Sequence, residues 1–251
     1  MMRTGMWGRF FVPMSTPRLV LAAALVAAFT MTAPPASAQR RDPDGERCAN
    51  VGNALTPEQQ VNACNTYLRA LGVSRNNRAQ AFKSRANAYR QMRQFEQAFA
   101  DYDEAIRLQP NHANIRNNRG IAERMAGNPE RALADFTTAI EIDPAFANAY
   151  SNRGSVHAEM GNFEAAIADH TRAIELNDRL ASAYNGRGIA YRALGRDDLA
   201  LADFEQALRI NAQYADALRN RARTREAMGL TELAESDGSQ APDQIAAVDR
   251  R

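Results

Sequence analysis

Small apolar residues recur along the middle of the chain at a fixed step of 34 positions. One alanine series comprises Ala98, Ala132, Ala166 and Ala200, and a second comprises Ala105, Ala139, Ala173 and Ala207. A period of this length predicts an all-α solenoid, in which each helix pair buries its apolar face against neighbouring pairs. Such a fold offers a long binding surface and seldom supplies catalytic groups.

Four full units of helix, turn and helix are predicted at 79–112, 113–146, 147–180 and 181–214. A glycine in the turn of the last three units, as at Gly127, is expected to end the first helix in a left-handed conformation. The residues after two of these glycines, Asn128 and Asn162, are expected to cap the second helices. Residues 215–235 are predicted to form a capping helix. Residues 236–251, rich in Gly, Ser, Pro and charge, are predicted to form a disordered tail.

Residues 39–78 are predicted to form a leader and a helical cap before the first unit. Thr56 is a suitable N-cap for a helix there, with a proline and an acidic residue following in the first turn. Cys48 and Cys64 are the only cysteines. An even pair in an exported chain favours a disulfide, worth roughly 3 kcal/mol, and the alternative is two free thiols or half of a metal site.

The first 38 residues have the pattern of a Sec-type secretory signal peptide. Three arginines are their only charges, an apolar run follows at Leu19–Phe29, and Ala36–Ala38 offers small residues to a signal peptidase. The run is too short to span a bilayer, although an uncleaved membrane anchor is the alternative. We therefore expect cleavage after Ala38, a periplasmic or secreted protein, and no stable membrane insertion after cleavage.

Charge and motifs exclude several classes of function. The chain has 31 basic and 29 acidic side chains, and loss of the three signal arginines leaves 28 against 29. Such a balance creates no field that attracts nucleic acid or an anionic membrane. The histidines His112, His157 and His170 lack metal-binding spacing, and no nucleophile or phosphate-loop motif occurs. We expect no metal, no cofactor and no enzymatic activity.

One set of residues defines the repeat motif: Tyr150, Gly154, Gly161, Phe163, Ala166, Ala173 and their counterparts one period away. This motif resembles the tetratricopeptide repeat family over about residues 79–230. The resemblance implies a right-handed superhelix whose first helices line a concave groove. It also implies binding to another protein rather than catalysis.

The second unit departs from the family pattern. Arg116, Glu123 and Pro129 stand where the family usually has large apolar groups, and His170 does so in the third unit. Because such residues reduce local burial, we expect unit 113–146 to be the least stable. Arg116 and Glu123 are expected to compensate each other in part.

Arginines and aspartates also recur at the 34-residue step and predict a structural ladder between helices: Arg85, Arg119, Arg153, Arg187 and Arg221, with Asp101, Asp135, Asp169 and Asp203. Arginine binds a carboxylate through two parallel hydrogen bonds, and the alternative is an anion-binding ladder. The sequence leaves open whether Arg119 pairs with Asp101 or Asp135. In either register, one terminal arginine is expected to lack a partner.

The register of the family places an amide-rich, basic set of residues on the concave wall. The candidates for peptide binding are Lys83, Asn87, Arg90, Asn114, Asn117, Asn118, Arg124, Asn148, Asn152, Asn185 and Arg192, with Ser151, Ser155, Arg219 and Arg223 in the same register. Amides both donate to and accept from a peptide backbone, and cations bind its carboxylates. The alternative is that Asn118 and Asn152 hydrogen-bond only within the fold.

Part of this wall resembles the carboxylate clamp with which some tetratricopeptide domains hold the C-terminal tails of chaperones. Lys83, Asn87 and Asn118 match the clamp, whereas Asn148 and Asn152 replace its last two cations with amides. The resemblance therefore favours a non-catalytic scaffold that binds an extended peptide or chain terminus in the cell envelope. The alternative is a self-associating structural module in envelope assembly, with a possible homo-oligomer.

Overall fold

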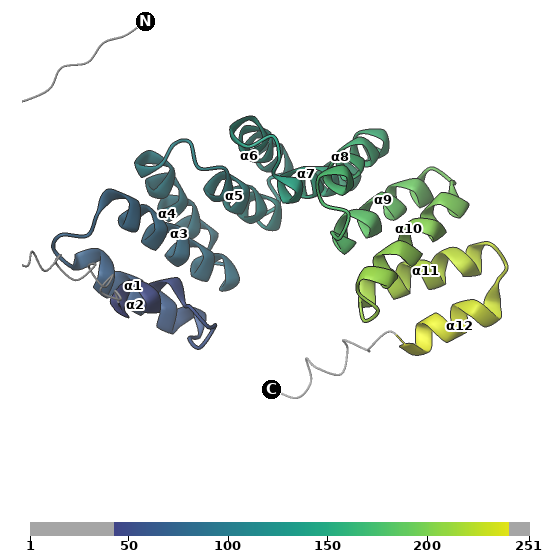
Figure 1. Ribbon diagram of the computed structural model, residues 1–251, viewed down its shortest axis with the longest axis horizontal. Helices are drawn as coiled ribbons and strands as arrows, with labels where there is room; N and C mark the ends of the chain where they lie inside the picture. Colours follow the sequence, from purple (N-terminus) through teal and green to yellow (C-terminus); the bar gives the residue numbers. More distant parts are fainter. Residues whose placement is uncertain (1–42, 241–251) are drawn as a thin grey trace, which may run out of the picture. The chain divides into compact units, whose positions relative to one another are not determined.

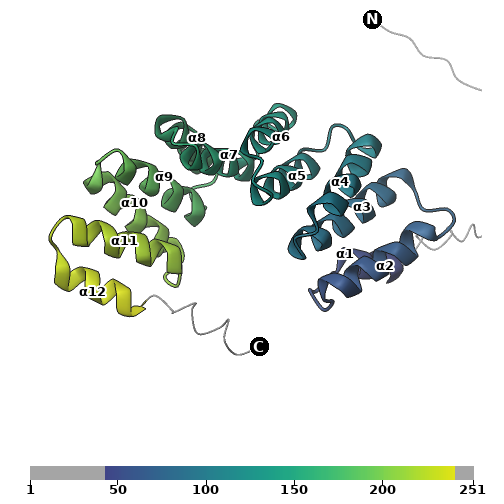
Figure 2. The same ribbon diagram turned by 180° about the vertical axis from the view of Figure 1, so that it is seen from behind.

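The computed structural model describes residues 43–240, so the signal peptide predicted at 1–38 lies outside the described residues. This part of the chain contains twelve α-helices and no strand. Figures 1 and 2 show the helices following one another in chain order. They are α1 (Pro43–Ala49), α2 (Pro57–Arg69), α3 (Arg75–Gln91), α4 (Phe95–Leu108), α5 (Ala113–Met125), α6 (Pro129–Ile142), α7 (Ala147–Glu159), α8 (Phe163–Leu176), α9 (Ala181–Ala193), α10 (Asp197–Ile210), α11 (Ala215–Ala227) and α12 (Thr231–Gln240).

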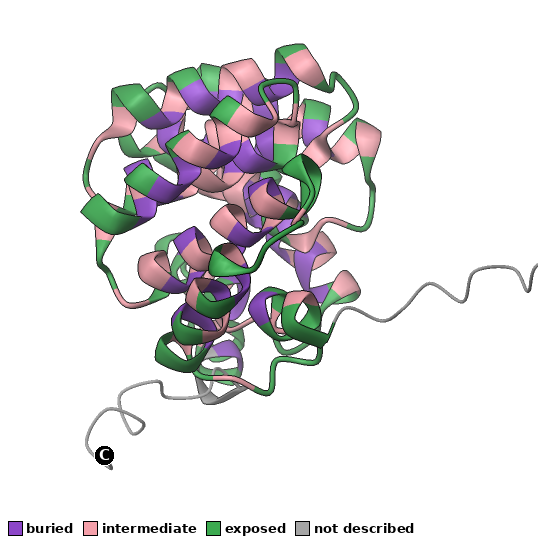
Figure 3. Cartoon of the chain, turned by 90° about the vertical axis from the view of Figure 1, so that its left-hand side faces the viewer, coloured by how far each residue is buried: buried purple, intermediate pink, exposed green. Residues whose placement is uncertain are grey.

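The helices pack as antiparallel pairs, as expected for a helical repeat. Each odd-numbered helix packs against the even-numbered helix that follows it, and each pair contacts the next pair. The first helices also contact one another in the order α3, α5, α7, α9 and α11. We call the exposed side of these five helices the first-helix wall. Figure 3 shows buried residues alternating with intermediate and exposed residues along the helices.

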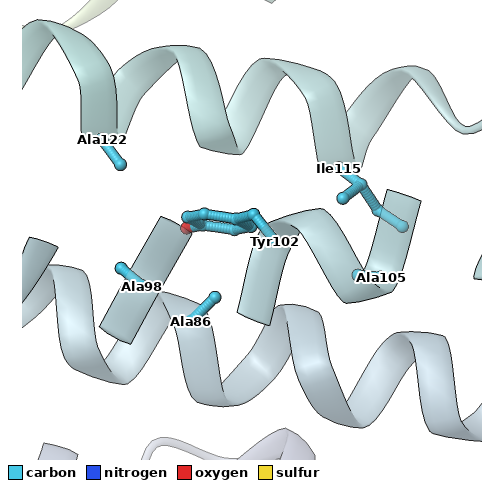
Figure 4. Packing of buried hydrophobic residues seen from close by; sticks show 6 residues of the cluster. All are labelled: Ala86, Ala98, Tyr102, Ala105, Ile115 and Ala122. Carbon is cyan, nitrogen blue, oxygen red and sulfur yellow. The ribbon is translucent and has the colours of Figure 1, made fainter. Parts of the chain in front are cut away.

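Small residues allow the helices of one unit to approach closely. Figure 4 shows Tyr102 of α4 between Ala86 of α3 and Ala122 of α5, and all three residues are fully buried. In the next unit the corresponding ring, Phe136, lies against Gly120, where an added Cβ would stand only 2.8 Å from the ring. Such a separation is too short for real carbon atoms, so close packing of the ring requires glycine at that position.

A residue in the left-handed conformation ends each first helix from α3 to α11. The φ angles of Gly127, Gly161 and Gly195 are 84°, 80° and 71°, which confirms the prediction for these turns. Asn128 and Asn162 occupy the predicted N-cap positions of the second helices, but neither side chain forms the expected cap hydrogen bond. Asn128 is the N-cap residue of α6, but its amide nitrogen donates to the Glu123 carboxylate at 2.7 Å, and no side-chain cap bond forms.

The N-terminal helical region is stabilised by a capping box at the start of α2 and by a disulfide between α1 and α2. Thr56 caps α2 in a capping box. Its hydroxyl accepts a hydrogen bond from the backbone N–H of Gln59, and the side-chain oxygen of Gln59 accepts one from the backbone N–H of Thr56. Cys48 of α1 and Cys64 of α2 form the predicted disulfide, and both sulfur-bearing residues are buried.

The Arg–Asp ladder joins the two helices of each unit. Arg119 of α5 donates to Asp135 of α6 through Nε at 2.8 Å and Nη2 at 2.6 Å, and the same bidentate pair recurs in the other ladder units. Each aspartate therefore stands 16 residues after its arginine, and Arg119 pairs with Asp135 rather than Asp101. The pKa of Arg119 is raised, chiefly by its hydrogen bond to Asp135.

The third guanidinium nitrogen of each ladder arginine from Arg85 to Arg187 reaches the preceding unit. Arg153 Nη1 donates to Thr137 Oγ1 of α6 at 3.2 Å, and Arg187 Nη1 donates to Thr171 Oγ1 of α8 at 3.2 Å. Each of these guanidinium groups therefore connects three helices. The guanidinium of Arg153 also stacks over the Tyr150 ring, 5.7 Å from its centroid. In the second unit Arg116 replaces this aromatic residue. Its ion pair is with Asp135 at 3.9 Å and not, as expected, with Glu123.

The C-terminal end differs from the prediction of a capping helix at 215–235 and a disordered tail from 236. Two helices occupy this region, because α11 ends at Ala227, Gly229 forms the turn, and α12 packs on α11. Asp237 of α12 is 1% exposed and accepts bidentate bonds from Arg221 at 2.9 and 2.5 Å. The expectation that one terminal arginine lacks a partner is therefore wrong, since Asp237 lies one further step of 34 after Asp203.

Candidate functional site

Two cations in the N-terminal half of the wall are not neutralised by the fold. Lys83 of α3 is half-buried and forms no ion pair with any residue from 43 to 240, and burial lowers its pKa. Arg90, two turns further along α3, directs Nη1 at the sulfur of Met125 at 3.4 Å, and its buried Nε has no hydrogen-bond partner. Positive charge at these two positions is therefore available to an external anion.

Some of the asparagines that were predicted to bind a peptide form hydrogen bonds to other asparagines of the fold. Asn152 donates to Asn117 at 2.9 Å, and the equivalent Asn220 donates to Asn185 at 3.0 Å. Asn117 and Asn185 are 5% and 6% exposed, so their accepting oxygens are already used. These amide bridges join neighbouring first helices, which is the alternative stated above for Asn152.

The remaining wall amides keep part of their bonding capacity. Asn87 accepts a bond of 2.6 Å from the Tyr102 hydroxyl, and this interaction leaves its amide nitrogen unused within residues 43–240. Burial raises the pKa of Tyr102 to about 12, so the hydroxyl stays protonated and acts as a donor. Asn118 donates weakly to Asn114 at 3.4 Å, and both Asn114 and Asn148 are exposed.

A pocket of about 570 Å³ lies in the C-terminal half of the wall, over α7, α9 and α11. Its lining includes seven of the predicted wall residues, Arg124, Ser151, Asn152, Ser155, Asn185, Arg219 and Arg223, together with Glu159, His170, Gly186, Asp216 and Asn220. The predicted residues Lys83, Asn87, Arg90, Asn114, Asn117, Asn118, Asn148 and Arg192 do not line it. The structure therefore divides the predicted surface into two halves.

Most of the charge at the pocket rim is compensated. Arg124 of α5 binds Glu159 of α7 through Nε at 2.9 Å and Nη2 at 2.5 Å. Arg219 binds Asp216 within α11. Arg223 is the one lining arginine without an ion pair to a residue from 43 to 240. The rim therefore presents matched charges rather than a strongly positive field.

His170 of α8 forms part of the pocket floor. It is 0% exposed, and neither ring nitrogen has a hydrogen-bond partner within the described residues. Burial lowers its pKa to about 4, with a smaller contribution from the nearby arginines Arg187 and Arg124, so the imidazole is neutral at pH 7. A neutral imidazole has one donor nitrogen and one acceptor nitrogen, and both are unused here.

The other two histidines lie apart from the pocket and from any metal-binding cluster of the described residues. No group of three or more His, Cys, Asp or Glu side chains between 43 and 240 is placed to hold a metal ion. His112 lies in a turn, where its Nε2 is 3.4 Å from the Gln80 amide nitrogen, and His157 lies on α7 with its Nδ1 unpaired. None of the helices in this part is long and apolar enough to cross a membrane.

Two sequence profiles described as tetratricopeptide repeat match the chain, one over residues 86–151 and the other over residues 146–213. The chain is a tetratricopeptide repeat protein. Proteins of this family mediate protein–protein interactions and are typically non-catalytic. No curated protein matches the sequence significantly.

Solved structures of bacterial tetratricopeptide repeat proteins resemble this one. PilW, a type IV pilus biogenesis factor, is 19% identical with a TM-score of 0.70, covering 82% of this chain and 94% of its own. PilF of Pseudomonas aeruginosa is 18% identical with a TM-score of 0.62, covering 66% and 76%. MamA is 25% identical with a TM-score of 0.55, covering 64% and 95%. At 19% and 18% identity, the similarity to PilW and PilF shows a shared fold but does not by itself show a shared function.

Two features of this tetratricopeptide surface were missed from sequence. The pocket acids Glu159 and Asp216 neutralise two arginines, Arg124 and Arg219, that were predicted to lie on the ligand-binding wall. Gly186 and His170 meet at the pocket floor, although only the second was noted as a departure from the family. A signal for Gly186 was present, because the residues one period before and after it are Asn152 and Asn220.

Proposed function

We propose that this chain is an exported, non-catalytic scaffold of the bacterial cell envelope, whose first-helix wall binds an extended peptide or chain terminus of another protein. One observation carries the proposal: Lys83 and Arg90 lie on the wall without a carboxylate partner from residues 43–240, whereas the ladder arginines are all paired. A half-buried cation without a partner is unfavourable, and an acidic group on a ligand would offset that cost.

The neighbouring amide supports this role. Asn87 stands one turn after Lys83 on α3 and keeps its amide nitrogen for a ligand, since only its oxygen is bound to Tyr102. A cation with an adjacent amide donor suits a carboxylate beside a peptide backbone. The partner is therefore expected to present an acidic side chain or a terminal carboxylate to α3, while its extended backbone continues along the wall.

The proposed location in the envelope rests on the signal-peptide pattern and on the disulfide between Cys48 and Cys64. PilW, which resembles the chain in fold, is described as a pilus biogenesis factor, and assembly of an envelope structure suits the same location. N-terminal sequencing of the protein from the periplasmic fraction is expected to give a chain that begins at Gln39. Recovery of an uncleaved chain from the membrane would contradict the location.

Site-specific crosslinking in living cells tests the binding surface. A photoreactive amino acid at the exposed wall position 114 is expected to capture a partner, and the same group at exposed position 172 on α8 serves as the control. The double substitution Lys83→Ala/Arg90→Ala should abolish the adduct at 114 because it removes both unpaired cations. An adduct that persists in this variant, or that forms equally at 172, would refute the surface.

A second candidate, self-association through the ends of the solenoid, has its own support. Leu71, before α3, is 99% exposed, and Leu233 on α12 is 50% exposed, so both terminal regions carry uncovered apolar side chains. Light scattering at several concentrations distinguishes this candidate. A concentration-dependent dimer that is lost in Leu71→Ser/Leu233→Ser would favour it, and a constant monomer mass would exclude it.

A further inference from the structure

One wall position interrupts a series of asparagines. Residues 118, 152 and 220 are Asn, whereas residue 186 of the same series is Gly. Asn152 and Asn220 each donate to an asparagine about one unit earlier in the chain. At Gly186 the residue in the accepting position is Ser151, and no side-chain bridge can form between α7 and α9 at this point. The pocket of about 570 Å³ lies over this interruption.

The His170 ring lies against the bare backbone of Gly186. A Cβ added at Gly186 would overlap the Cε1 and Nε2 atoms of the ring, so histidine and glycine are a matched departure from the repeat. The corresponding residues in neighbouring units, Phe136 and Phe204, are fully buried hydrocarbons. His170 is equally buried but carries two polar nitrogens without partners in the described part of the chain. Buried polar groups are nearly always hydrogen-bonded, so this exception points to an external partner.

The surroundings favour a neutral partner group. Hydroxyl and amide side chains, among them Ser151, Ser155 and Asn185, line the same pocket as His170. Glu159 and Asp216 at the rim neutralise two of the three lining arginines. The imidazole is itself uncharged at pH 7. A carboxylate would be attracted by Arg223 but repelled by Glu159 and Asp216, and an ammonium group would meet the opposite balance, so the lining charges favour neither ion over a neutral group.

We propose that the pocket binds the carboxamide side chain of an Asn or Gln in an extended segment of the partner protein, with His170 Nε2 as its hydrogen-bond partner. This inference rests on the proposed function and specifies one side chain of the ligand. A carboxamide has both a donor and an acceptor, so it can pair with Nε2 in either tautomer of the ring. The ligand amide would take the place of the asparagine that Gly186 lacks.

Access to the ring requires a small movement. His170 has no exposed surface, so Nε2 becomes available to a ligand when the ring tilts toward the pocket. Gly186 has no side chain to restrain this tilt, whereas a residue with a Cβ at that position would collide with the ring. His170 therefore supplies the unpaired donor and acceptor, and the missing side chain of Gly186 leaves room for the ring movement that exposes them.

A matched variant removes the pocket chemistry and restores the repeat. His170→Phe/Gly186→Asn introduces the residues found one period away at 136 or 204 and at 152 or 220. The probe is a phage-displayed library of random octapeptides, selected in parallel on the wild-type chain from residue 39 and on the double variant. We expect wild-type selection to enrich Asn or Gln at least 3-fold at one peptide position, and the variant to lose this enrichment while still binding acidic peptides.

The outcomes separate this inference from the proposed function. No enriched Asn or Gln, an enriched Asp or Glu in their place, or an enrichment that persists in the double variant would overturn the carboxamide site. Peptides enriched on both proteins through acidic residues alone would leave the proposed wall intact and refute only the pocket. Failure of both proteins to retain any peptide above the empty support would refute both.

A direct measurement covers the case in which the double variant folds poorly. Titration of wild-type protein with a synthetic peptide from the selected pool is followed by NMR of the three imidazole Cε1–H groups. The His170 signal is expected to shift, while His157 and His112, which do not line the pocket, stay within experimental error. A peptide that binds with no shift at His170, or with equal shifts at all three histidines, would overturn the assignment.

Discussion

The arginines of the Arg–Asp ladder and the residues of the first-helix wall lie on the same five helices, yet only the ladder keeps its residues from unit to unit. The ladder position is Arg in α3, α5, α7, α9 and α11. A wall position two residues earlier reads Lys83, Asn117, Ser151, Asn185 and Arg219 along the same helices. The ladder position, which joins two helices, keeps the same residue type in all five units, because a buried bidentate ion pair needs both its arginine and its aspartate. The wall series has different roles along the chain, because Asn117 and Asn185 accept amide bridges between first helices, whereas Lys83 forms no ion pair within residues 43–240.

The wall itself divides by the same logic. Its N-terminal half has unpaired cations on α3, and its C-terminal half has a pocket with paired charges at the rim and an unpaired imidazole below. The two halves therefore offer an extended ligand different chemistry at its two ends. Predictions on ladder positions concern stability, and predictions on wall positions concern binding.

Loss of one ladder arginine has the largest expected effect. Arg153→Ala leaves Asp169, 6% exposed, without its partner and should lower the free energy of unfolding by about 3–5 kcal/mol. Urea denaturation followed by circular dichroism measures the loss. Arg172→Ala is the control, because the ion pair of Arg172 with Glu175 is about half exposed and its loss should leave the free energy of unfolding nearly unchanged. Equal effects of the two substitutions would contradict the distinction between ladder and surface.

His170 makes stability depend on pH. Its pKa is about 4 in the fold against 6.5 in an unfolded chain, so the unfolded state alone binds the proton between these values. Stability contributed by the neutral ring is fully present above pH 6.5 and falls as pH drops toward 4, by roughly 3 kcal/mol. Asp169 opposes this shift of the pKa, and Arg187 and Arg124 add to it.

The His170→Phe variant separates this titration from that of the carboxylates. Denaturation of both proteins from pH 7 to 4 gives their free energies of unfolding. As the pH falls, the wild type should lose more stability than the variant. A difference that stays constant over this range would show that the ring titrates normally, and would place it in contact with water.

The disulfide stabilises a unit that lacks the ladder. The position one period before Arg85 is Val51, so no ladder arginine joins α1 to α2. Cys48→Ser/Cys64→Ser is expected to lower the free energy of unfolding by roughly 3 kcal/mol for a separation of 16 residues. Hydrogen exchange should show the loss confined to α1, α2 and the start of α3. Faster exchange spread evenly to α12 would contradict a local role.

Lys83→Met is expected to have the smallest effect on stability. Since burial lowers the pKa of Lys83 and no ion pair is lost within the described residues, the free energy of unfolding from urea denaturation should change by less than ~0.5 kcal/mol or rise slightly. The same substitution should weaken the crosslink at position 114. A marked loss of stability would show that Lys83 belongs to the fold rather than to the ligand surface.

The sequence predicted the helix pairs and their turns because these depend on local signals, namely alanine spacing, turn glycines and the Thr56 cap. It could not decide the ladder register, since Arg119 has an aspartate of the same type on either side in sequence. Asp237 was missed because the composition of the tail outweighed its place in the 34-residue series. Asn117 and Asn185 were predicted to face a ligand because sequence spacing does not show which amides meet each other across two helices.

Asp237 determines how far the chain must extend to stay intact at its C-terminal end. It binds Arg221 and also Arg225, whose Nη1 lies 2.7 Å from it. A cut in the turn at Gly229 would remove this shared carboxylate and leave two half-buried guanidinium groups side by side on α11. Their mutual repulsion would loosen α11 from α10, although Glu205 at 3.3 Å from Arg225 would retain part of the attraction. A shortened version of this protein should therefore end after residue 237, even where composition suggests an earlier boundary.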